Sequence, residues 1–231
     1  MTTSMHTRLA AVGLASGPLL FTLGDLLRRL VEPSGTPSAG AITAAVHEHG
    51  GVWLVAGLLS VTAAFCVVPG VWGLLAAAGG RGARTTVVGA LLVGAGALAL
   101  VGHTVAFYAP YALYARAHTP VDDLTAVDRA SESYPLLIAL IVVFIVGMAI
   151  GPVVLLVGLR RARRVPVWAV VAAVVFAVSG SGGGVGLGML GIGAAAAAFL
   201  PAARSLLVTG TAREEQGTPA DGRGGLVAEA T

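Results

Sequence analysis

Long apolar segments with few or no charged residues constrain the fold of this chain more than any other feature. A helix rises about 1.5 Å per residue and the hydrocarbon core of a bilayer is about 30 Å thick, so about 20 apolar residues in a row cross it. Of the 231 residues, 56% are hydrophobic and 11% are charged, whereas soluble domains contain about 25% charged residues. The sequence therefore predicts a helical integral membrane protein.

Four segments are long and apolar enough to be transmembrane helices. They are 9–27, 52–78, 86–107 and 136–159. A further apolar stretch, 166–201, would extend about 52 Å as one helix, which is too long for a single span. The run from Ser179 to Gly184 divides it, because glycine weakens helices and readily adopts turn conformations. We therefore expect a fifth span at 167–179 and a sixth at 185–203.

The predicted organisation is all-α: a bundle of six transmembrane helices at 1–208, followed by a disordered cytoplasmic tail at 209–231. Arginine residues prefer cytoplasmic loops, and all 14 basic residues of the chain are arginines. Six spans with an inside N-terminus leave four of them outside and ten inside. The inside group is Arg8, Arg81, Arg84, Arg160, Arg161, Arg163, Arg164, Arg204, Arg213 and Arg223, and the outside group is Arg28, Arg29, Arg116 and Arg129. Both termini are therefore predicted to be cytoplasmic, whereas a five-span alternative places the last three inside arginines outside.

Two of the outer segments are predicted to contain a helix. The first outer segment contains a short helix at 38–49, which follows a turn rich in Pro and Gly. In the second, Thr119 is the expected N-cap and Pro120 the first helical residue. Apolar residues about one turn apart, Leu124 and Val127 among them, predict an amphipathic helix that lies on the membrane or on neighbouring helices.

Ionisable residues near the outer ends of the helices form the only cluster with candidate chemistry. Its members are Asp25, His47, Glu48, His49 and His103. Imidazoles and carboxylates bind zinc, copper or nickel, and a histidine beside a carboxylate can act as a base. His47 and His49 are two residues apart, however, which points them to different sides of a helix. We assign no catalytic residue, metal ligand or cofactor from this pattern.

For Asp25, two structural roles are alternatives to metal binding or catalysis. It is three and four residues before Arg28 and Arg29, the spacing of an ion pair on a helix surface. Alternatively, Asp25 contacts His103 between the first and third spans.

Glycines in the last third of the chain predict close helix packing. Gly180, Gly184 and Gly188 follow a four-residue spacing that lets two membrane helices approach each other. The spacing from Gly186 to Gly191 imitates a dinucleotide-binding loop, but no strand precedes it and no acidic residue follows at the required distance. The arginines lie in short clusters beside apolar runs, so nucleic acid is not an expected partner.

The chain resembles the uncharacterised small multi-pass integral membrane proteins of actinobacterial type. The residues that carry the resemblance are Asp25 late in the first span, Trp53 at the start of the second, and the run from Val67 to Gly70 within it. The resemblance implies a membrane-embedded helical bundle and assigns no activity or site residue.

Three classes of function remain open from the sequence. The first is a non-enzymatic component or accessory subunit of the cell membrane, with the bilayer and either a second copy or another membrane protein as partners. The second is passive transport of neutral solutes, since spans two, four, five and six carry no ionisable residue in their central turns. The third is an enzyme or metal-binding protein that uses the outer polar cluster.

Overall fold

The computed structural model describes residues 5–217, with side chains for 5–209, and its regular elements there are all helical. The helices are α1 (Met5–Val31), α2 (Ala39–Ala77), α3 (Ala83–Ala117), α4 (Val121–Ser133), α5 (Pro135–Ile145), the π-helical η1 (Val146–Ile150), α6 (Gly151–Arg161), α7 (Val167–Ser179) and α8 (Val185–Gly217). Five helices in this part of the chain are long and apolar enough to cross a membrane: Met5–Val31, Ala39–Ala77, Ala83–Ala117, Pro135–Arg161 and Val185–Thr209. The prediction of an all-helical, membrane-embedded chain is confirmed at this level.

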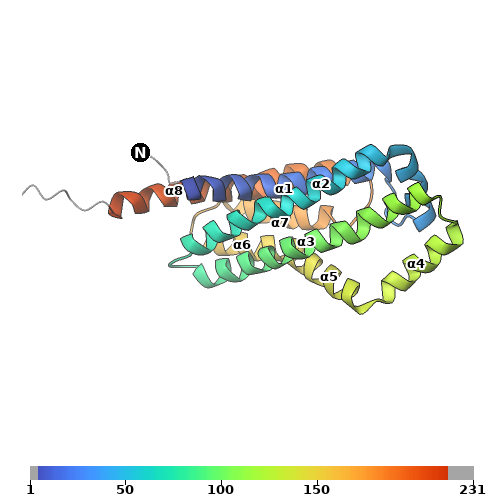
Figure 1. The fold of residues 1–231 in the computed structure, drawn as a ribbon. Coiled ribbons are helices and arrows are strands. Elements are labelled where there is room, and N and C mark those ends of the chain that lie inside the picture. The colour runs from blue at the N-terminus through green and yellow to red at the C-terminus, as the bar shows by residue number, and fades with distance from the viewer. Residues whose placement is uncertain (1–4, 218–231) are drawn as a thin grey trace, which may run out of the picture.

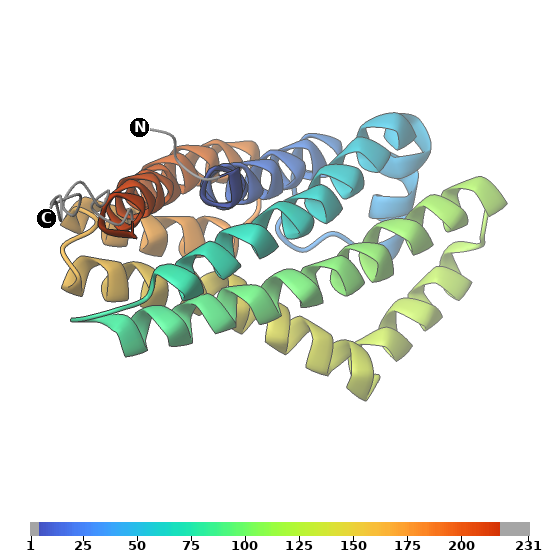
Figure 2. The same cartoon turned by 60° about the vertical axis from the view of Figure 1, so that its left-hand side comes forward.

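The helices of the bundle contact one another in a closed order (Figures 1 and 2). α1 packs on α2, α2 on α3, α3 on α6, α6 on α7, α7 on α8, and α8 back on α1. Small and branched side chains such as Ala97, Leu155, Ala169 and Ala195 fill the middle and are at most 1% exposed. The beginning of α1 and the end of α8 lie at the same end of the bundle.

Glycines set the distance between neighbouring helices. A Cβ atom on Gly70 of α2 would lie 2.8 Å from the backbone nitrogen of Leu14 on α1. A Cβ atom on Gly96 of α3 would lie 2.7 Å from the Cα atom of Gly147 in η1. Side chains at these positions do not fit without movement of a helix, so the backbones touch as in other membrane bundles rich in small residues.

The segment predicted as one span at 136–159 contains a π-turn, which the sequence analysis did not predict. The backbone N–H of Gly151 bonds to Val146 O, five residues back, and Pro152 follows without an N–H of its own. On the side of this turn that leads to α4, α5 diverges from α3, so the two helices form a V. α4 runs between their far ends and closes it (Figures 1 and 2). No residue of α5 is buried.

The outer segments differ in detail from the prediction. The helix expected at 38–49 exists, but it continues into the second span across a kink at His49 (φ −123°, ψ 32°), so both form α2. Ser38 caps it, accepting a hydrogen bond from the backbone N–H of Ala41 at 3.2 Å. α4 is capped by Pro120 and not by Thr119, and Leu124 is its only buried residue.

The two segments predicted as the last spans form the helices α7 and α8, which are of unequal length. α7 has 13 residues and rises only about 20 Å. α8 continues to Gly217 and so overlaps the beginning of the tail predicted at 209–231, whose disorder stays a prediction. Residues 218–231 of the predicted tail lie outside the described residues.

Candidate functional site

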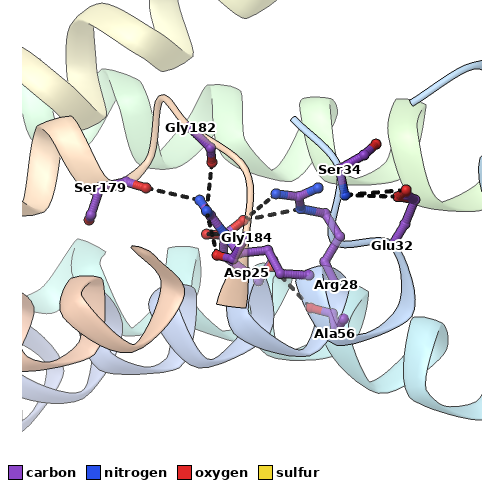
Figure 3. A network of polar contacts seen from close by, with 10 residues as sticks. Asp25, Arg28, Glu32, Ser34, Ala56, Ser179, Gly182 and Gly184 are labelled. Carbon is purple, nitrogen blue, oxygen red and sulfur yellow. Dashed lines mark hydrogen bonds and ion pairs between the residues drawn. The ribbon is translucent and has the colours of Figure 1, made fainter. Parts of the chain in front are cut away.

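The last two turns of α1 carry a partly buried network of charged residues, of which Arg29 is the buried member (Figure 3). Asp25 accepts hydrogen bonds from Arg28 at Oδ1 (2.9 Å from Nη2 and 3.1 Å from Nε) and from Arg29 at Oδ2 (2.7 Å from Nε). These are the i, i+3 and i, i+4 pairs that the sequence predicted, and both are confirmed. One carboxylate thus serves two guanidinium groups.

Arg29 joins α1 to the chain between α7 and α8. Its Nη1 donates to Gly182 O (2.6 Å) and Gly184 O (3.2 Å), and its Nη2 donates to Ser179 O (2.9 Å). The side chain of Arg29 is fully buried, whereas that of Arg28 is 22% exposed. Adjacent arginines that share a carboxylate therefore have different environments, and only Arg29 bonds a distant part of the chain.

The hydrogen bonds of Arg29 provide partners for carbonyl groups at the end of α7 and in the turn that follows it. The last carbonyl groups of a helix have no partner within the helix, and a buried carbonyl without a partner costs several kcal/mol in lipid. Gly184 has a φ of +91°, a conformation that favours glycine, and it turns the chain into α8. The arginine thus supplies donors where helix and turn leave acceptors. The sequence predicts an outer position for Arg29 and a pairing with Asp25 but not this role, because nothing in a linear pattern links position 29 to positions 179–184.

The structure separates the other members of the predicted polar cluster. His103 on α3 stacks on Phe144, with ring centroids 4.7 Å apart, and more loosely on Phe107 at 6.1 Å. His47 lies beside His118 at the outer ends of α2 and α3, with centroids 5.4 Å apart. Glu48 and His49 are exposed next to the α2 kink. Among the described residues no group of three or more His, Cys, Asp or Glu is placed to hold a metal ion.

The predicted glycine face is not formed by one helix. Gly180 is the C-cap of α7, and Gly184 lies in the turn before α8 with nothing within 4 Å of its Cβ position. Only Gly188 packs between helices, where a Cβ atom would lie 2.9 Å from a methyl group of Leu26 on α1. The four-residue spacing fails as a packing pattern because the first two glycines break the helix that would carry it.

An aromatic cluster holds α2, α3 and α4 together at the end of the bundle that contains α4. Trp53 is 1% exposed, and its Nε1 donates to Tyr108 O at 2.9 Å. Tyr111 donates from Oη to Asp128 Oδ1 of α4 at 3.0 Å. A cavity of about 300 Å³ lies between α3, α4 and α5 beside this contact. The sequence signal for the cluster was the concentration of aromatic residues near the outer boundary.

The competing Asp25 to His103 contact leads to a testable expectation. Because Asp25 is bonded to two arginines and His103 stacks on Phe144, the two residues are expected to act independently. The losses of unfolding free energy from Asp25→Asn and His103→Ala should add in the double variant to within about 0.5 kcal/mol. Chemical unfolding in detergent micelles measures all three variants. A coupling above about 1 kcal/mol would contradict this expectation and show that the two residues interact, either directly or through Arg28, which pairs with Asp25 and lies close enough to His103 for an electrostatic interaction.

Comparison of the chain with family models, with curated proteins and with solved structures gives no match. The class that the fold defines is a helical, membrane-embedded bundle with at least five helices able to cross a bilayer. Its function has to be argued from the bundle itself.

Proposed function

We propose that the protein is a non-enzymatic component of the cell membrane that crosses the bilayer six times, with both ends in the cytoplasm. The observation that carries the proposal is the Arg29 network: Arg29, the buried charged residue at the end of α1, and its partner Asp25 hold two parts of the fold together. Groups that are bonded in this way are not free to bind a substrate or move a proton.

The position of α7 supports the sixth crossing. α7 runs between the arginine-rich turn after α6 and the level of Arg29, and the beginning of α1 and the end of α8 lie at one end of the bundle. Its rise of about 20 Å is shorter than the hydrocarbon core of about 30 Å. The crossing is then completed by the segment 180–184, whose carbonyl groups Arg29 supplies with donors.

The packing of the interior supports a structural role over transport. The ring of six helices is filled by the side chains of one continuous apolar core, including Leu14, Leu155 and Phe199. A solute path through one copy would have to displace this core. Many glycines of the bundle are used for packing within the chain, at α1 with α2 and at α3 with η1 and α6. A partner therefore has the apolar outer surface available, which includes the whole of α5, since none of its residues is buried.

Labelling with a membrane-impermeant maleimide tests the topology. Cys66 is the only cysteine of the chain, so Cys66→Ala gives a background without thiols. In intact cells Ser181→Cys should be labelled, as should Gly50→Cys in the outer part of α2, while Gly79→Cys between α2 and α3 should react only after the membrane is opened. All three positions are exposed. Protection of Ser181→Cys in intact cells, with Gly50→Cys labelled, would contradict six crossings.

The structural role is tested with the intact chain. Purification in a mild detergent should recover either a defined oligomer or a stoichiometric membrane partner, and proteoliposomes should be no more permeable to small neutral solutes than protein-free vesicles. Saturable solute flux would contradict the proposal and favour the transport alternative.

A further inference from the structure

A cavity of about 820 Å³ opens between α7 and α8 at the end of the bundle where α8 approaches its C-terminus. Arg163 and Arg164 from the turn before α7 line it together with Arg204 of α8. The remaining wall is apolar and includes Trp168 and Leu200, both of which are exposed on the surface of the bundle. Three cationic groups thus border a surface that otherwise suits hydrocarbon.

The three guanidinium groups have no hydrogen-bond or ion-pair partner within the part of the chain whose side chains the structure describes. The two arginines that precede them in the chain do have hydrogen-bond partners: Arg160 donates to Val165 O at 3.4 Å, and Arg161 donates to Thr85 Oγ1 at 3.2 Å. Both ion pairs found among the described residues involve Asp25, at the other end of α1. Like charges that converge on one cavity repel one another unless an anion joins them.

The turn that carries two of these arginines has a defined conformation. The backbone N–H of Arg163 bonds to Arg160 O and that of Arg164 bonds to Leu159 O, each at 2.9 Å. Arg163 has a φ of +57°, which is uncommon for a residue with a side chain. The turn therefore presents the two side chains from a fixed backbone instead of a flexible loop.

We propose that this cavity binds an anionic phospholipid of the adjoining leaflet. The phosphate lies among Arg163, Arg164 and Arg204, because guanidinium groups donate paired hydrogen bonds to phosphate oxygens. An acyl chain follows the apolar wall past Leu200, and Trp168 stands at the level that tryptophan prefers, between head groups and hydrocarbon. Basic pockets between transmembrane helices bind anionic head groups in this way. The site goes beyond the proposed structural role and does not depend on how many times the chain crosses the bilayer.

The test measures lipid binding to the full-length chain in detergent. Phosphatidylglycerol and phosphatidylcholine with identical acyl chains are titrated, and bound lipid is counted by native mass spectrometry alongside the melting temperature. Wild-type protein should bind phosphatidylglycerol saturably and at least about tenfold more tightly than phosphatidylcholine, a difference of about 1.4 kcal/mol. Soluble glycerol phosphate is the third ligand, and it should bind far more weakly, because it lacks the chain that fills the apolar wall.

Two double variants with the same change of charge distinguish lipid binding in the cavity from general electrostatic attraction between arginines and anionic lipid. Arg164→Gln with Arg204→Gln alters the cavity. Arg81→Gln with Arg84→Gln alters two exposed arginines, one in the α2–α3 connection and one in the first turn of α3, which do not line it. The cavity variant should lose the preference for phosphatidylglycerol, and the control should keep it. Arg204→Gln alone, at an exposed position of α8, gives the same readout if the double variant does not fold.

Equal binding of the two lipids by wild type, or equal losses in both double variants, would overturn the proposal. Glycerol phosphate binding as tightly as the lipid would identify a soluble phosphate ligand and also overturn it.

Discussion

Replacement of Arg29 by methionine is expected to lower the free energy of unfolding by about 3–5 kcal/mol, the loss typical of removing one partner from a buried ion pair. Methionine retains the length of the side chain but donates no hydrogen bond. The carbonyl groups of Ser179, Gly182 and Gly184 lose their donors, and Asp25 keeps only Arg28. The connection between α7 and α8 should loosen from α1 before the rest of the bundle unfolds.

The neighbouring arginine provides a matched control. Arg28→Met removes the same charge and breaks bonds to the same carboxylate, but Arg28 is partly exposed and bonds no distant residue. Its loss should be about 0–1 kcal/mol, as for exposed ion pairs. Denaturation by sodium dodecyl sulfate in mixed micelles, followed by circular dichroism, measures both variants. Similar losses for the two arginines would mean that charge, and not the bonds to the α7–α8 connection, explains how this network stabilises the fold.

The parts of the fold that depend on local composition could be predicted from the sequence. Apolar runs gave the long helices, and the glycine run gave the break at α7 and α8, because both follow from burial and backbone freedom within one segment. The pairing of Asp25 with Arg28 and Arg29 was also accessible, since three and four residues bring side chains together on any helix.

Features that depend on contact between distant segments could not be predicted in the same way. The role of Arg29 requires knowing that α8 returns beside α1, which places residue 182 against residue 29. The π-turn at Val146–Ile150 depends on the approach of Gly147 to Gly96 on another helix. The histidines were grouped because they share a side of the membrane, but His103 faces an aromatic ring of α5 while His47 lies at the end of α2.

The second large change in stability is expected from glycine-to-alanine substitutions. Of two helical glycines in the bundle, one packs against another backbone and the other faces open space. A Cβ atom on Gly96 would lie 2.7 Å from the backbone of Gly147, whereas one on Gly193 of α8 would have nothing within 4 Å. Gly96→Ala should therefore lower the unfolding free energy by about 1–3 kcal/mol through overpacking. Gly193→Ala should raise it by about 0.5–1 kcal/mol, because alanine favours the helix.

The opposite signs of these two changes make the comparison informative. Both variants add one methyl group to a helix, so the gain in helix propensity is common to them and the difference isolates the contact between α3 and η1. The same micelle denaturation measures both. Since Gly96 approaches Gly147 in η1, the element that directly follows α5, the alanine should also widen the V between α3 and α5. A spin label pair on those two helices would report the change as a longer distance. A gain of stability in Gly96→Ala equal to that in Gly193→Ala would show that the two backbones are not in contact and that the divergence of α5 has another cause.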